Sequence, residues 1–286
     1  MNNAQAGGAC LLSVDVEDYF QVEAFAAVID REDWPHLESR VERNTERVLA
    51  LLAECRARAT FFILGWVADR FPQLVRTIQA QGHEVACHSY WHRQIFRLDS
   101  SQFREDTRRA KGVIEQAAGT RVVGYRAPSF SVVRKSLWAL EVLVEEGFRY
   151  DASIYPIHHD NYGIPDWNPN PQWLTYPVGR IFEIPNSTVR VLGMNFPCGG
   201  GGYLRLLPFE VTKAALRRIA RTPGRHAVIY VHPWEFDPEQ PRIKASRLSR
   251  FRHYTNLDQT ETRLRNLLRE FSTKPMRELL DPAEVS

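Results

Sequence analysis

The sequence lacks the features that mark several large classes of protein. Its four cysteines are scattered and include no CxxC pair, which argues against a disulfide framework or a zinc ribbon and indicates reduced, mostly buried thiols. They are Cys10, Cys55, Cys87 and Cys198. No apolar run approaches the roughly 20 residues that a membrane-spanning helix needs, so we expect no transmembrane segment.

Long runs of one charge are also missing. The net charge is +3 and no run of five or more basic residues occurs, so we expect no nucleic-acid partner. The segment Met1 to Gly8 is small and polar, without the charged start and apolar core of a secretory signal. We therefore expect a cytoplasmic protein.

Two phosphate-binding motifs are absent as well. No GxGxxG follows the first strand-like segment, and the run Gly199 to Gly202 is not followed by Lys-Ser or Lys-Thr. The glycine run is better explained as a mobile loop, and we expect it to lie over a binding site.

What the chain has is a regular alternation of short apolar segments with helical ones. The strand candidates are continuously apolar or β-branched, as expected of strands covered on both faces. They are residues 10–15, 59–64, 83–87, 122–125, 182–184 and 227–231. Apolar residues recur at helical spacing within 41–55 and 137–144, and Pro72 suits the first turn of another helix. This alternation predicts an α/β fold with a parallel sheet, either open or closed as a barrel.

Three segments need separate interpretation. Residues 156–177 are rich in proline, asparagine and aromatics without periodicity, which predicts a functional loop. Near the C-terminus, Leu264, Leu267 and Phe271 indicate an amphipathic helix that packs against the barrel. Residues 104–109 are highly charged and predict an exposed, salt-bridged helix face.

Polar side chains stand at the ends of the predicted strands. They are Asp15, His88, Arg126, Asp151 and His232. In a parallel barrel the carboxyl ends of the strands share one face, where such barrels carry their active sites. We therefore expect these five side chains to meet in one site.

His88 and His92 are the strongest indication of chemistry. Two imidazoles four residues apart can lie on one face of a helical turn and bind one divalent ion, with a carboxylate as third ligand and an open position for water. A lone HxxxH pair is more often two unconnected histidines, so the interpretation depends on the acidic cluster Asp15 to Asp18 lying nearby.

Five stretches, in this order, carry a family resemblance. They are residues 13–18, 88–92, 125–130, 150–153 and 230–233. Over about residues 10–233 the sequence resembles the polysaccharide deacetylase family, the carbohydrate esterases with a NodB-homology domain. The tail at 251–258 is similar to the branch encoded beside exopolysaccharide and exosortase loci. The resemblance implies a distorted (β/α)7 barrel with a C-terminal helical extension. Residues 9–286 would form a single domain, on which residues 240–286 pack as the extension.

The resemblance also implies an activity. The enzyme would hydrolyse the acetamide of N-acetylated sugars in an exopolysaccharide or its precursor. Its partners would be an N-acetylated oligo- or polysaccharide and the exopolysaccharide assembly machinery. His88 and His92 would hold a divalent metal, Zn²⁺ in the first place, with Co²⁺ or Ni²⁺ as alternatives.

Roles for the other polar residues follow from the same resemblance. Asp15 would be the general base and would pair with Arg126, and His232 would protonate the departing amine. Asp151 would be the carboxylate that keeps His232 protonated, because a nearby negative charge raises an imidazole pKa.

One position departs from the commonest family pattern, in which two adjacent aspartates are base and ligand. Val16 occupies the ligand position here, so the third ligand is Glu17 or Asp18, and a base–x–ligand spacing found in some relatives favours Glu17. Two other functions stay open: a metal-independent cyclic amidohydrolase, as in allantoinase-like members, and a non-catalytic saccharide-binding protein.

Candidates for substrate contacts are mostly aromatic, because an aromatic face offers apolar area to the C–H edges of a sugar. They are Pro128, Phe130, Trp167, Trp173 and Trp234. The triplet His158 to Asp160 is better explained as a solvated or substrate-facing patch than as a second metal motif.

Overall fold

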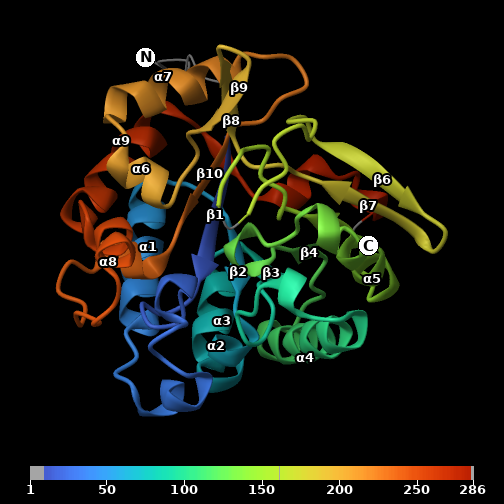
Figure 1. The fold of residues 1–286 in the computed structure, drawn as a ribbon, viewed down its shortest axis with the longest axis horizontal. Helices are drawn as coiled ribbons and strands as arrows, with labels where there is room; N and C mark the ends of the chain where they lie inside the picture. Colours follow the sequence, from blue (N-terminus) through green and yellow to red (C-terminus); the bar gives the residue numbers. More distant parts are fainter. Residues whose placement is uncertain (1–9, 161, 285–286) are drawn as a thin grey trace.

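Seven parallel strands form the centre of the molecule (Figure 1). The computed structural model describes residues 10–160 and 162–284, so the predictions for Met1 to Gly8 and for residue 9 as domain start lie outside the described residues. The parallel strands are β1 Cys10–Val16, β2 Thr60–Ile63, β3 Glu84–Cys87, β4 Gly124–Tyr125, β5 Tyr150–Asp151, β7 Gly179–Glu183 and β10 Val228–Val231. Their order in the sheet is β10-β1-β2-β3-β4-β5-β7. This mostly parallel α/β architecture confirms the predicted fold class.

Among the described residues, no backbone ladder pairs β7 with β10, and two other contacts to β10 are found instead. Ser187 Oγ accepts a hydrogen bond from the Val228 N–H at 2.6 Å, and Gly200 forms an isolated bridge with Tyr230. A Cβ on Gly200 would lie 2.0 Å from the Tyr230 carbonyl oxygen, so no other residue fits there without a shift of the backbone. Gly199, Gly200 and Gly201 therefore pack tightly on β10, and steric fit is what these three glycines supply.

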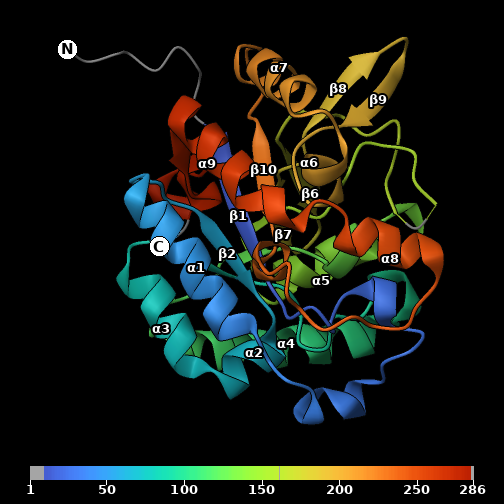
Figure 2. The ribbon, with the colours of Figure 1, turned by 90° about the vertical axis from the view of Figure 1, so that its left-hand side faces the viewer.

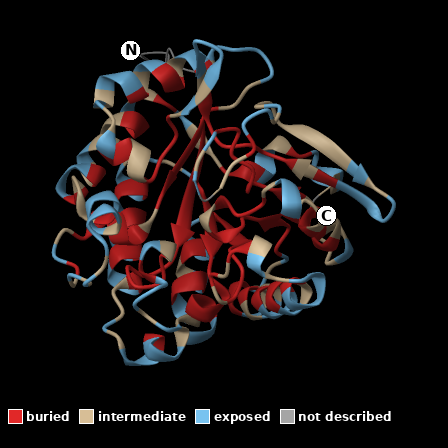
Figure 3. Ribbon diagram, in the orientation of Figure 1, coloured by how far each residue is buried: buried red, intermediate tan, exposed pale blue. Residues whose placement is uncertain are grey.

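Helices cover the sheet on its outer side, and the strands between them are buried (Figure 3). The helices are α1 Val41–Glu54, α2 Gly65–Arg70, α3 Pro72–Ala80, α4 Ser100–Ala118, α5 Trp138–Glu145, α6 Gly202–Leu206, α7 Phe209–Ala220, α8 Arg247–Tyr254 and α9 Thr260–Glu270. α1 and α5 agree with the helical periodicity of the sequence, and Pro72 occupies the first position of α3 as predicted. Among the described residues, no helix combines the length and apolarity that crossing a membrane requires.

Two antiparallel hairpins were not predicted. β6 Gln172–Tyr176 pairs with β7 and projects as an arm from the molecule, so the prediction of an irregular loop throughout 156–177 is wrong for its last part (Figure 1). β8 Thr188–Val191 and β9 Met194–Pro197 form the second hairpin. β6 alternates only weakly between apolar and polar residues, which hid it from an analysis of periodicity.

The C-terminal residues pack on the sheet, and α9 forms ion pairs with α1 through Arg47–Glu261 and Arg265–Glu54 (Figure 2). β11 Thr273–Lys274 pairs with the start of β1, and Met276 is buried beneath the strands. Leu264 and Leu267 of α9 are buried in the same apolar core as β1. The amphipathic helix expected in this region is therefore present and packed as expected.

Candidate active site

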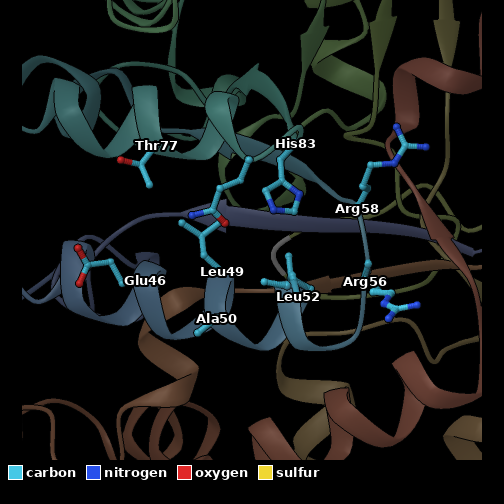
Figure 4. A pocket seen from close by; sticks show the side chains of 11 residues that line it. Glu46, Leu49, Ala50, Leu52, Arg56, Arg58, Thr77 and His83 are labelled. Atoms are coloured by element: carbon cyan, nitrogen blue, oxygen red, sulfur yellow. The ribbon is translucent and has the colours of Figure 1, made fainter.

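A pocket of about 620 Å³ opens at the carboxyl ends of β1, β3 and β10. Its polar lining includes Asp15, Glu17, His88, His92 and His232. A second pocket, of about 580 Å³, lies between α1 and α3 at the amino ends of β2 and β3, and none of the predicted site residues line it (Figure 4). The predicted chemistry therefore belongs to the first pocket.

Glu17, His88 and His92 form the one group of potential metal ligands found among the described residues. Their ligand atoms all lie within 4.8 Å of one another, and all three residues are buried. Glu17 Oε2 lies 2.6 Å from His92 Nε2 without hydrogen-bond geometry, which leaves this buried oxygen with no hydrogen-bond partner. An orphaned carboxylate oxygen between two imidazoles is the arrangement that a shared cation would satisfy.

The tautomer of His88 suits metal binding. Its Nδ1 lies 2.8 Å from the Arg126 carbonyl oxygen, which can only accept, so Nδ1 carries the proton and Nε2 presents its lone pair. Burial is the main cause that lowers the pKa of His88 to about 4, so the ring is neutral near pH 7. Two nitrogens and one carboxylate oxygen fit the open three-ligand sites of catalytic zinc.

The segment from His88 to His92 is an irregular loop, so the expected helical turn is wrong. Ser89 and His92 both have left-handed backbone conformations, with φ of 62° and 51°. Two side chains fix the loop: Ser89 Oγ accepts a hydrogen bond from the His92 N–H at 3.1 Å, and Asp106 of α4 accepts one from the Tyr90 N–H at 2.7 Å. Asp106 is buried, although the charged pattern around it predicted exposure.

Asp18 lies outside the metal cluster, which corrects its place among the predicted ligands. Its Oδ2 accepts hydrogen bonds from the backbone N–H groups of Arg40 and Val41, at 2.8 and 3.2 Å, and from the Ser39 hydroxyl at 2.7 Å. Successive side chains of an extended chain point to opposite sides, so Asp15 and Glu17 share one side and Asp18 faces the start of α1. The carboxylate therefore holds the N-terminus of α1.

Asp15 and Arg126 pair as predicted. Arg126 Nη1 lies 2.7 Å from Asp15 Oδ1 and donates a further hydrogen bond to Ser13 Oγ. Arg126 Nε binds the Ala152 carbonyl oxygen at 3.1 Å, and the guanidinium lies over the Phe62 ring. These contacts hold the buried arginine in place and leave Asp15 Oδ2 facing the pocket, 3.9 Å from His232 Nε2.

The carboxylate beside His232 is Glu235, which the analysis of the sequence missed. Glu235 Oε2 lies 3.1 Å from His232 Nδ1 and also accepts a hydrogen bond from the His232 backbone N–H at 2.9 Å. Burial works to lower the pKa of His232, but Glu235, Glu17 and Asp15 outweigh it and raise the pKa to about 9. Arg205 donates to Glu235 Oε1 at 2.7 Å and, against the effect of burial, helps to hold the pKa of Glu235 down at about 2.

Asp151 does not contact His232, so the predicted pairing of these two residues is wrong. β5 pairs with β7 in a register that places Asp151 opposite Glu183, and both carboxyl groups are buried. Ser153 donates to Asp151 through both its hydroxyl and its backbone N–H, at 2.5 and 3.0 Å. Burial raises the pKa of both Asp151 and Glu183, and the neighbouring charge of Asp151 raises that of Glu183 further.

Comparison with known proteins agrees with this geometry. Residues 30–148 match the family described as polysaccharide deacetylase, and residues 152–281 match a domain of unknown function (DUF3473). Residues 30–148 therefore belong to the polysaccharide deacetylase family. The chain is 30% identical over 148 residues to a chitooligosaccharide deacetylase of Sinorhizobium fredii, covering 51% of this chain and 61% of that protein.

A second curated relative is also named as a deacetylase. A peptidoglycan-N-acetylglucosamine deacetylase of Bacillus cereus is 29% identical over 111 residues, which is 38% of each chain. The chain therefore spans less than two thirds of the length of these curated relatives. A solved structure from Mycobacterium smegmatis classed with the polysaccharide deacetylases has a TM-score of 0.61 and 19% identity, covering 96% of this chain and 90% of its own. At this identity the likeness shows the shared fold.

The predicted substrate contacts divide into two groups. Phe130 and Trp234 line the pocket, whereas Pro128 is buried and does not line it. Trp173 packs against Phe182 on the projecting arm, and Trp167 packs on the apolar core, so neither lines the pocket. Both lie in the segment without periodicity, where the sequence does not show which way a side chain points.

Further aromatic and charged residues line the pocket. His159 and Asp160 are among them, which agrees with a substrate-facing patch, and so are Tyr162, Tyr203, Arg252 and His253. The Trp234 ring lies between the rings of His232 and His253, and its Nε1 donates to Glu17 Oε1 at 3.2 Å. Tyr162, Arg252 and His253 lie outside the five stretches from which the site was predicted.

Proposed function

We propose that the protein is a metal-dependent N-deacetylase that removes acetyl groups from an N-acetylated saccharide. The observation that carries the proposal is the buried cluster of Glu17, His88 and His92 in the same pocket as Asp15 and His232. Membership in the polysaccharide deacetylase family supports it, as do relatives named as deacetylases of chitooligosaccharides and of peptidoglycan N-acetylglucosamine.

Glu17, His88 and His92 would hold the metal, in the first place Zn²⁺, with Co²⁺ or Ni²⁺ as alternatives. When bound, a divalent cation supplies Lewis acidity, which lowers the pKa of water and polarises a carbonyl oxygen. The Trp234 indole fixes the other oxygen of Glu17, so the carboxylate is oriented before any ligand arrives.

Asp15 is the general base in this proposal. Arg126 engages Oδ1 and leaves Oδ2 free at the pocket floor, where it takes the proton of the attacking water. A buried guanidinium at 2.7 Å pairs with the carboxylate and fixes its orientation.

His232 is the general acid that protonates the departing amine. The Nδ1–H group donates to Glu235, so the proton that is transferred sits on Nε2, which faces Asp15 and Glu17. Glu235 stabilises the imidazolium and holds the ring, as a carboxylate does in a catalytic acid–base pair.

The pocket suits a short stretch of saccharide. Its volume lies within the roughly 300–1,000 Å³ of small-molecule sites, and Phe130, Tyr162, Tyr203 and Trp234 offer aromatic faces to sugar rings. We propose an exopolysaccharide or its precursor as the substrate, and a role beside the assembly machinery, on the resemblance of residues 251–258. We also propose that residues 9–286 act as one domain, supported by the pairing of β11 with β1.

The test is acetate release from N-acetylglucosamine oligomers before chelation, after EDTA, and after Zn²⁺, Co²⁺ or Ni²⁺ is restored. We expect activity to be lost and then regained. Undiminished turnover by protein shown to be metal-free, together with turnover of small ureides, would favour the cyclic amidohydrolase. Oligosaccharide binding by the metal-loaded protein without any acetate release would favour a saccharide-binding protein.

A further inference from the structure

The outward face of α8 carries exposed apolar side chains beside the pocket. Leu248 and Phe251 are 54% and 57% exposed, and three-residue spacing places them on one face of the helix. Arg247 lies four residues before Phe251, and Arg252 lies four residues after Leu248, so the two arginines flank this face. His253, on the opposite side of the helix, is buried. A short helix that presents apolar residues to solvent between arginines has the pattern of an interfacial helix.

The segment around α8 is strongly basic. Between Glu239 and Asp258 the sequence has no acidic residue. Five exposed basic residues lie between them: Arg242, Lys244, Arg247, Arg250 and Arg252. In the part of the chain that the structure describes, Arg252 alone of these five forms an ion pair, with Asp160 at 3.8 Å. The face therefore presents uncompensated positive charge.

The β8–β9 hairpin presents a second apolar projection. Leu192 and Met194 at its tip are 94% and 61% exposed, and Val191 and Phe196 beside them are also exposed. Leu192 and Gly193 form a two-residue turn with φ of 49° and 82°, a turn in which asparagine is preferred at the first position. A leucine there costs local stability and exposes apolar area, so a contact outside the molecule is the better explanation of it.

Both projections lie near the pocket. Figure 2 shows the β8–β9 hairpin and α8 on the same side of the molecule, with α6 between them. Gly201, Tyr203 and Leu206, which follow β9, line the pocket, and so do Leu248 and Arg252 of α8. A flat surface that contacts both projections would therefore lie beside the mouth of the pocket.

We propose that this face docks on an anionic lipid bilayer. Two separate apolar projections, one set among arginines, suit a surface into which protruding side chains can insert and whose headgroups are negatively charged. A nucleic acid would leave Leu192 and Phe251 without an apolar environment. Docking would bring the pocket to saccharides held at the membrane surface, a consequence that rests on the proposed function.

The test is co-sedimentation with phosphatidylcholine vesicles, with and without phosphatidylglycerol, at low and high salt. We expect binding that requires phosphatidylglycerol and weakens with salt. Arg247→Gln with Arg250→Gln should weaken it on the order of 20-fold, since each basic residue near the surface contributes about fivefold. Phe251→Ser should weaken it roughly tenfold through the loss of inserted apolar area.

The β8–β9 hairpin provides a variant whose substitutions suit the native turn. Leu192→Asn suits the left-handed turn better than leucine does, so Leu192→Asn with Met194→Ser should keep the fold while weakening vesicle binding several-fold. Val178→Ser, at an exposed apolar position in the β6–β7 turn, is the matched control and should bind as the parent protein does.

Absence of vesicle binding, equal binding to neutral vesicles, or full binding by all three variants would overturn the proposal. Binding is measured without turnover, and none of the substituted residues lines the pocket. Acetate release from a soluble oligosaccharide should therefore be unchanged in these variants, and failure of the docking proposal is distinguishable from failure of the deacetylase proposal.

Discussion

Glu235 Oε2 lies 3.1 Å from His232 Nδ1, and the other oxygen of the same carboxylate accepts a hydrogen bond from Arg205 at 2.7 Å. Arg205 in turn donates to the carbonyl oxygens of Arg252, His253 and Thr255 at the end of α8. The imidazole at the pocket floor is thereby connected, through two buried charged groups, to the C-terminal segment. This segment helps to build the site as well as covering the sheet.

Glu235→Gln should lower turnover by about 10²-fold, because the imidazolium loses the charge that stabilises it while the hydrogen-bond geometry is largely kept. Metal content should be unchanged, since Glu235 is not among the clustered ligands. Steady-state kinetics with metal analysis checks this. Glu239→Gln, the same change at an exposed position four residues along, is the control and should behave as the parent protein. Full activity of Glu235→Gln would remove Glu235 from the proposed acid pair.

Glu17→Gln and Asp18→Ala should separate metal binding from stability. Glu17→Gln should lower the zinc stoichiometry, because an amide is a weaker ligand than a carboxylate. Asp18→Ala should keep the metal but lower the free energy of unfolding by about 1–3 kcal/mol, because it removes the acceptor at the start of α1. Metal analysis and urea denaturation of both variants check the pair. Normal zinc content in Glu17→Gln, or zinc loss in Asp18→Ala, would contradict the assignment.

Asp106→Ala should loosen the loop that carries the two histidines. The Asp106 carboxylate holds the Tyr90 N–H from α4 and also pairs with Arg93 at 3.2 Å. Without it we expect metal affinity to fall by roughly 10- to 100-fold, the usual effect of removing a residue that orients ligands. Competition with a chromogenic chelator measures this affinity. Glu105→Ala, on the exposed side of the same helix, should have no effect.

The sequence predicted those parts of the site that follow directly from strand ends. Asp15, His88 and Arg126 come straight after or within apolar strands, and the parallel sheet brings them together. Glu17 was preferred over Asp18 by spacing, and the alternation of an extended chain gives the physical reason for that spacing. These relationships are local or depend only on the direction of the strands.

The parts that were missed depend on packing between distant segments. Asp106 and Glu105 are neighbours in one charged helix, and only the contact with the loop at Tyr90 makes the first of them buried. Arg205 lies on a short helix without any motif, and its role comes from carbonyl groups some 50 residues later. Asp151 ends a strand as the other site residues do, but its register with Glu183 holds its side chain away from the pocket.

Asp15→Asn should abolish measurable turnover while the protein keeps its metal. The amide retains the shape of the carboxylate and can still accept a hydrogen bond from Arg126, but it cannot take a proton from water at neutral pH, and loss of a general base costs about 10²–10⁴-fold. The free energy of unfolding should fall by about 1–3 kcal/mol, because the buried guanidinium loses a charged partner. Acetate release, zinc content and urea denaturation of the same preparation check the three statements together. Loss of zinc would show that Asp15 is a ligand, and retained turnover would assign the proton transfer to another group in the pocket.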